Sequence, residues 1–149
     1  MISIEDSLGF SVVRTARGMK KVLESRLLLD SGVTASQHLV LSTLAHEDGL
    51  ALSEIGKRVF LDKPAISGLA DRLEKDGLVI RKRYKTDRRV VRLFLTEKGR
   101  NVLTNINTIV EDIDNAFTNL MTNRELATLR DLLDRLWSHS LERNGNGNS

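Results

Sequence analysis

The chain of 149 residues carries 23 Lys and Arg against 20 Asp and Glu, for a formal net charge of +3, and it contains no cysteine. This length is enough for one domain with a hydrophobic core. The absence of cysteine excludes a disulfide framework, a zinc site with thiolate ligands and a thiol redox switch. The N-terminus has neither the basic nor the apolar region of a signal peptide, and no apolar run approaches the length of a membrane span. We therefore expect a cytoplasmic protein without a membrane partner.

The first two expected helices cover residues 4–29 and about 34–46. The apolar residues of the first recur with the spacing of one helix face, at Leu8, Val12, Met19 and Leu23. A polar break at 30–32 ends it. Thr34 and Gln37 then form a capping box, which predicts the start of the second helix.

Residues 50–61 predict a short helix and a tight turn. Ser53 is expected to cap the helix, and Phe60 and Leu61 are expected to form the turn. Residues 50–52 can also add a short third strand to the hairpin that follows further along the chain.

A second short helix is expected at about 62–76. Asp62 is its predicted cap, Pro64 lies in the first turn, where no backbone N–H is needed, and Gly77 ends the helix. The apolar residues at i, i+3 and i+7 form a buried stripe: Ile66, Leu69 and Leu73. The two helices and their turn have the pattern of a helix-turn-helix.

A strongly basic hairpin is predicted next, with strands at 79–84 and 90–95. Residues 53–100 hold 14 Lys and Arg against seven Asp and Glu, so the rest of the chain is net acidic. Such a local positive field is typical of proteins that bind a polyanion. A solvated charged hairpin is the alternative, but its position beside a helix-turn-helix favours nucleic-acid binding.

Two further helices complete the chain. Thr96 is the predicted cap of a helix at 96–120, and Thr122 with Glu125 forms another capping box that opens the last helix. A polar, Gly-rich tail at 143–149 is expected to be disordered.

The terminal helices carry more apolar surface than one small lobe can cover. We therefore expect a homodimer built from residues 4–29 and 105–141. The alternative is a layer of three helices within one chain. The expected interface residues are Leu8, Val12, Ile113, Phe117, Leu126, Leu129, Leu133, Leu136 and Trp137.

Three motifs carry a family resemblance. They are L-x-D-K-P-A-I-S-G-L-A-D-R-L-E-K-D-G-L-V-I-R-K-R at 61–83, D-R-R-V at 87–90 and L-T-E-K-G at 95–99, and V-T-A-S-Q at 33–37 fits the same order. With them the chain resembles the MarR-type winged-helix transcriptional regulators over most of 1–149. The resemblance implies a mainly α fold with a small β wing (α+β), a DNA-binding lobe at 34–99 and long N- and C-terminal helices that form a two-fold dimer.

The start of the second short helix is expected to read base edges in the major groove. Lys63 can donate to guanine, the Ala65 methyl can touch a thymine methyl, and Ser67 can pair with several bases. Arg72 is expected to contact a phosphate. Asp71 is acidic on this face and is expected to fix an arginine through an ion pair.

The hairpin is expected to enter the minor groove. Asp87 can accept from the guanidinium of Arg89, and the resemblance implies that Arg89 is the minor-groove reader. We expect the neighbouring cations to contact phosphates: Arg83, Lys85 and Arg88. Arg81 and Arg92, nearer the strand bases, are expected to be merely solvated.

The resemblance also implies a cleft for a small anionic or aromatic effector. Arg14, Arg17 and His38 are the candidates for its lining, although His38 is more often an ordinary core or surface histidine. Three separated histidines and no cysteine do not predict a metal site. No cofactor motif and no catalytic grouping is found, so we expect no enzyme activity.

The function that these patterns favour is a homodimeric, ligand-responsive repressor that binds a palindromic operator. The alternative is a winged helix used as a protein-interaction or assembly module without specific DNA binding.

Overall fold

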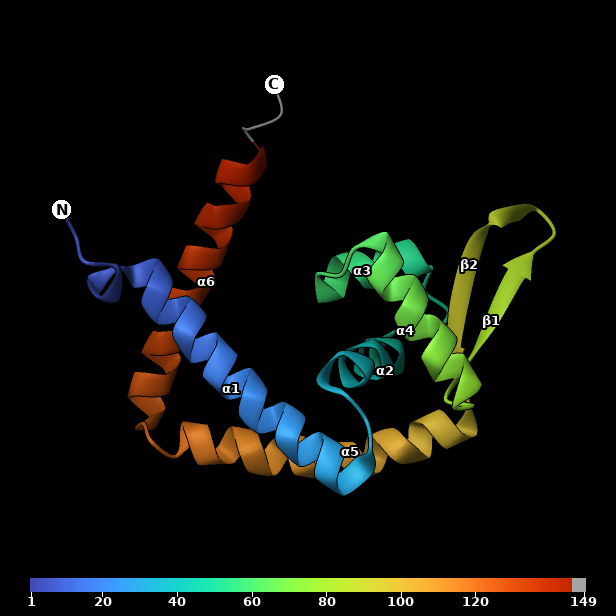
Figure 1. Cartoon of the computed structure of the whole chain (residues 1–149), viewed down its shortest axis with the longest axis horizontal. Helices are drawn as coiled ribbons and strands as arrows, with labels where there is room; N and C mark the ends of the chain where they lie inside the picture. Colours follow the sequence, from blue (N-terminus) through green and yellow to red (C-terminus); the bar gives the residue numbers. More distant parts are fainter. Residues whose placement is uncertain (146–149) are drawn as a thin grey trace. The chain divides into compact units, whose positions relative to one another are not determined.

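The computed structural model describes residues 1–145 and divides into two compact units, which meet in sequence at Val110 and Glu111 (Figure 1). A short 3₁₀ turn, six helices and one antiparallel pair of strands make up the described chain. In order they are η1 (Ile4–Asp6), α1 (Leu8–Ser31), α2 (Ala35–His46), α3 (Leu52–Val59), α4 (Lys63–Lys75), β1 (Val79–Tyr84), β2 (Asp87–Leu95), α5 (Glu97–Thr118) and α6 (Asn123–Gly145). The predicted class, mainly helical with a small β wing, is confirmed.

The core of the first unit lies where α2, α3, α4 and β2 meet. Its fully buried side chains include Leu41, Leu44, Ile55, Leu73 and Leu93. The predicted stripe of the second short helix is part of this core: Ile66, Leu69 and Leu73. Burial of large aliphatic side chains from four elements fixes the orientation of α4 relative to the strands.

A second, smaller cluster joins the end of α1 to the start of α2 and to α5. It contains Leu27, Val33, Ala35 and Ile106. In α1, Leu27 is the single buried residue over 24 positions, so most of the apolar stripe of this helix remains exposed.

Helix boundaries follow the predicted caps at most positions. Both bonds of the Thr34–Gln37 box form, at 2.9 and 3.1 Å, and Asp62 Oδ1 accepts from the Ala65 amide at 2.9 Å. Ser53 was predicted wrongly as a cap. The N-cap of α3 is Ala51, whose methyl side chain cannot accept a cap bond, and its extended backbone pairs with Arg92.

The wing differs from the prediction in its second strand and its edge. β2 begins at Asp87 rather than at residue 90, and the register is irregular between Arg83, which pairs with Val91, and Tyr84, which pairs with Asp87. In place of a third strand at 50–52 there is one bridge between Ala51 and Arg92.

The second unit contains the end of α5 and α6. The Thr122–Glu125 capping box is confirmed, with bonds of 3.0 and 3.1 Å. α6 ends at Gly145, so residues 143–145 are helical rather than part of a disordered tail, and the rest of that predicted tail lies outside the described residues. Over residues 1–145, no helix is both long and apolar enough to cross a bilayer.

Gly99 of α5 permits a close approach that an alanine would prevent. A Cβ atom at this position would lie 2.2 Å from the carbonyl oxygen of Leu78. We expect Gly99→Ala to lower the free energy of unfolding by about 2–3 kcal/mol, because the backbone must move to relieve the clash. Urea denaturation followed by circular dichroism measures the change.

Gly68→Ala is the matched control, since no atom lies within 4 Å of a Cβ built on Gly68 in α4. That change should instead stabilise the protein by about 0.5–1 kcal/mol, through helix propensity. A Gly99→Ala protein as stable as the wild type would contradict the prediction.

Candidate nucleic-acid interface

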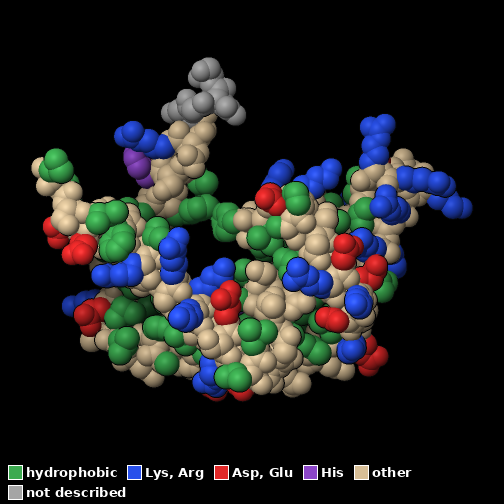
Figure 2. All heavy atoms as spheres, in the orientation of Figure 1, with side chains coloured by type: hydrophobic (Ala, Val, Ile, Leu, Met, Phe, Trp, Pro, Cys, Tyr) green, Lys and Arg blue, Asp and Glu red, His purple; other side chains and the backbone are tan. Residues whose placement is uncertain are grey.

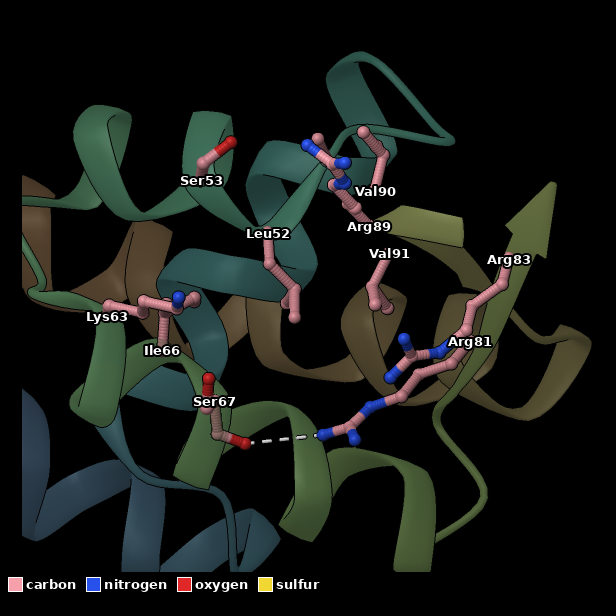
Figure 3. A pocket seen from close by; sticks show the side chains of 11 residues that line it. Leu52, Ser53, Lys63, Ile66, Ser67, Arg81, Arg83, Arg89, Val90 and Val91 are labelled. Atoms are coloured by element: carbon pink, nitrogen blue, oxygen red, sulfur yellow. Dashed lines mark hydrogen bonds between the residues drawn. The ribbon is translucent and has the colours of Figure 1, made fainter. Parts of the chain in front are cut away.

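A basic hollow of about 520 Å³ lies between the start of α4 and the wing (Figure 3). Figure 2 shows Lys and Arg side chains gathered over the wing at the right of the view. The hollow is lined by Ala51, Leu52, Ser53, Lys63, Ile66, Ser67, Arg81, Arg83, Arg89, Val90 and Val91. Four of these residues are cations and none is acidic, so the local potential favours an anion.

The residues of α4 that were predicted to contact bases or a phosphate divide between two hollows. Lys63 and Ser67 line the basic hollow beside the wing. Ala65 and Arg72 line another hollow, of about 380 Å³, which also includes Thr34 at the start of α2. The structure therefore brings Lys63 and Ser67 together with the wing, and it turns Ala65 and Arg72 toward α2.

Arg81 is not solvated as predicted but holds β1 to α4. Its Nη2 donates to the Ser67 carbonyl at 3.3 Å and forms an ion pair with Asp71. Its backbone N–H donates to Glu74 Oε2 at 3.1 Å. The predicted ion-pairing role of Asp71 is confirmed, and its partner is Arg81.

Arg92 also has a structural role in place of the predicted solvation. Its Nη1 donates to the Gly49 carbonyl at 2.9 Å and so ties β2 to the turn before α3.

The sequence contained one indication that Arg81 is not simply solvated. In a strand, a side chain two residues after the buried Val79 points to the same face as Val79. The apolar stripe predicted for α4 did not indicate that this helix contacts Arg81.

Asp87 orders the wing through the backbone rather than through a guanidinium. Its Oδ1 accepts from the N–H of Arg89 at 3.1 Å. Arg83 Nη1 donates to the Arg88 carbonyl at 3.1 Å, across the turn. Arg83 and Arg89 line the basic hollow, whereas Lys85 and Arg88 are exposed beside it.

The predicted effector residues are not brought together by either hollow. Arg14 and Arg17 are exposed on α1, and the guanidinium of Arg14 lies 5.8 Å from the centroid of the Phe10 ring. His38 is buried on α2, with its Nε2 3.0 Å from Ser42 Oγ. Its Nδ1 is buried and has no hydrogen-bond partner among the described residues.

Burial lowers the pKa of His38 below its ordinary value of 6.5. Unfolding therefore takes up a proton at pH values between the folded pKa and about 6.5, and stability should fall as the pH drops through that window. We expect a slope of at most about 1.4 kcal/mol per pH unit from this one group. Urea denaturation between about pH 7.5 and 5.5 measures it.

His38→Gln should flatten this pH dependence, because glutamine keeps a polar side chain beside Ser42 but does not titrate. His46→Gln is the matched control, since it removes an exposed histidine from the same helix. An unchanged slope in His38→Gln would assign the effect to other groups.

The predicted dimer residues differ in exposure within one chain. Ile113 is buried, and Phe117 and Leu126 are half-buried. The others are exposed: Leu8, Val12, Leu129, Leu133, Leu136 and Trp137. α6 has no buried residue over its 23 positions, which leaves its apolar stripe available to a partner.

The described residues contain no group of three or more His, Cys, Asp or Glu that could hold a metal ion.

A model of the MarR family matches residues 33–91. The chain is 37% identical over 136 residues to the HTH-type transcriptional regulator TtmR of Methylorubrum extorquens, with 91% of this chain and 67% of that protein covered.

Two further comparisons agree with that match. The chain is 32% identical over 90 residues to the HTH-type regulator SarZ of Staphylococcus epidermidis, with 60% of this chain and 61% of SarZ covered. It therefore spans less than two thirds of the length of SarZ. Among solved structures, the PcaV transcriptional regulator of Streptomyces coelicolor, in complex with its natural ligand, has a TM-score of 0.78 and 25% identity, with 94% of this chain and 98% of PcaV covered. These proteins are transcriptional regulators rather than enzymes.

Proposed function

Because the chain belongs to the MarR family of transcriptional regulators, we propose that it acts as a homodimeric repressor that binds a palindromic operator. The start of α4 enters the major groove, with Lys63 and Ser67 at base edges, and the wing carries Arg89 into the minor groove. Regulation of transcription requires access to DNA, so we place the protein in the cytoplasm.

The basic hollow between α4 and the wing is the observation that carries this proposal. It gathers Lys63, Arg83 and Arg89 from three elements on one surface, beside a helix whose N-terminal end is exposed. A phosphate backbone that crosses this surface meets several cations at once, and the counterions it releases favour binding. Solvation of a charged hairpin alone does not explain why cations from α4, β1 and β2 converge.

The exposed apolar stripes of α1 and α6 support the homodimer. Large aliphatic side chains such as Leu8 and Leu133 are exposed on them, and contiguous apolar surface of this kind marks an interaction site. Two copies related by a two-fold axis would present their α4 helices to successive major grooves, about 34 Å apart.

An effector is the proposed means of release. PcaV binds a natural ligand. The buried Nδ1 of His38 has no hydrogen-bond partner among the described residues, and in the tautomer that carries a proton there it can donate to the carboxylate of an anionic or aromatic acid, with Arg14 and Arg17 on the neighbouring helix. Such a ligand shifts the dimer only by its differential affinity for the DNA-competent and incompetent arrangements, about 1–3 kcal/mol in typical cases.

Selection of duplexes from random DNA with the purified protein tests the proposal. The recovered sequence should be palindromic, and its affinity should exceed that of a scrambled duplex of equal length. The logarithm of the binding constant should fall linearly with the logarithm of the salt concentration, with a slope near −0.9 for each phosphate contact. Equal, weak binding to both duplexes would favour the alternative, a protein-interaction module.

A further inference from the structure

Arg81 is bonded to α4, the helix proposed to read the major groove and called the recognition helix below, at three positions. Its guanidinium reaches the Ser67 carbonyl and the Asp71 carboxylate, and its own amide donates to Glu74. The Arg81 side chain is 27% exposed, whereas Asp71 is 68% exposed. The Arg81 guanidinium therefore lies against α4, where it pairs with Asp71 on the exposed surface of the helix.

These contacts lie on one stripe of α4. Lys63, Ser67, Asp71 and Glu74 follow one another at intervals of four, four and three residues, so they share a helix face. That face is turned toward β1. Arg81 of β1 donates to Ser67 in the middle of the face, and Arg83, two residues further along the strand, lines the hollow. Arg81 therefore lies in the same hollow as the cations proposed to reach DNA.

We propose that Asp71 and Arg81 form a clamp that sets the angle of the wing to α4, so that Arg89 reaches the minor groove while Lys63 reads the major groove. The clamp rests on the DNA-binding function proposed above. Asp71 and Arg81 are positioning residues, because they act through Arg89 and the wing.

The charges of the pair suit this role. An exposed carboxylate on the recognition helix would repel a phosphate, but the ion pair with Arg81 offsets its charge. Arg81 Nε is buried without a hydrogen-bond partner among the described residues, so the guanidinium is held through its Nη2 contacts. In Asp71→Asn the side-chain oxygen can still accept from Arg81, but the negative charge that holds the guanidinium on α4 is lost.

Double-mutant cycles with the selected duplex test the clamp. In the wild-type background, Arg89→Ala should weaken binding by about tenfold or more. In the Asp71→Asn background the same change should have an effect at least about threefold smaller, because the wing has already lost its position. The effect of Lys63→Ala should stay within about twofold of its wild-type value in both backgrounds.

Three further variants separate positioning from general damage. Asp76→Asn is the matched control: it makes the same chemical change at the end of α4, on a carboxylate with no ion pair among the described residues, and it should leave the Arg89→Ala effect unchanged. Asp71→Glu keeps the negative charge, so in this background Arg89→Ala should weaken binding nearly as much as it does in the wild type. Arg81→Lys keeps the charge but lacks the planar fork, and it should reduce that effect as Asp71→Asn does.

The outcomes are distinguishable. Selective loss of the Arg89→Ala effect in Asp71→Asn, with folding confirmed by thermal unfolding, supports the clamp. Additive effects, or equal losses for Arg89 and Lys63, overturn the clamp and leave DNA binding standing. A wild-type protein that binds selected and scrambled duplexes alike overturns the proposed function and the clamp with it.

Discussion

Replacing Arg89 with alanine is expected to lower the affinity for the selected duplex by about 1–3 kcal/mol per half-site, and by roughly twice that for a dimer on both half-sites. Arg89 lines the basic hollow, and its backbone is held by Asp87 within the irregular part of the wing. A minor-groove arginine meets the strongest negative potential of the duplex where the groove is narrow. Its loss should also relax selectivity at the base pairs beneath the wing.

Lys85→Ala is the matched comparison, because it removes a cation from the tip of the same hairpin, outside the hollow. It should weaken binding to all sequences alike. The dependence of the binding constant on salt should become less steep, by the amount that corresponds to about one phosphate contact. Fluorescence anisotropy with selected and scrambled duplexes at several salt concentrations measures both effects. Equal behaviour of the two variants would contradict the assignment of Arg89 to the minor groove.

The features that sequence reasoning located correctly are those that depend on neighbours along the chain. The caps at Thr34, Asp62, Thr96 and Thr122 each bond an amide three residues away, and the structure confirms all four. The apolar stripe of α4 follows the same logic, since helix period alone sets which residues share a face.

The errors arose where distant segments meet. Ser53 has the residue type of a cap, but α3 begins two residues earlier than a Ser53 cap would require, and its N-cap Ala51 pairs with Arg92, 41 positions away. Arg92 was expected in solvent because its partner, the Gly49 carbonyl, lies 43 residues away. No local pattern encodes such bonds.

The candidate site shows the same division. The motifs indicated which cations belong to α4 and the wing, and the hollow joins Lys63 and Ser67 with Arg83 and Arg89. They did not indicate that Ala65 and Arg72 share a different hollow with the start of α2, because this depends on the packing of α2 against the core.

Placing aspartate at both Leu129 and Leu133 is expected to abolish the dimer and, with it, specific DNA binding. The two leucines are one turn apart on α6 and are 39% and 45% exposed in the single chain. α6 has no buried residue within one chain, and most of the stability of helices in proteins comes from packing of an apolar face, so a partner surface is needed to stabilise it. Two buried carboxylates would oppose that contact strongly.

A monomer has one recognition helix and loses the second half-site, so affinity for the palindrome should fall toward the nonspecific level, by about 10³-fold or more. Ala127→Asp with Ser138→Asp is the matched control, because it adds the same charge on the opposite side of α6, given 3.6 residues per turn. Sedimentation velocity should show a dimer for the wild type and the control, and monomer or insoluble chain for the leucine variant. A wild-type protein that sediments as a monomer while it binds the palindrome with full affinity would exclude this interface, since the exposed stripe of α6 would then have no part in joining the two half-sites.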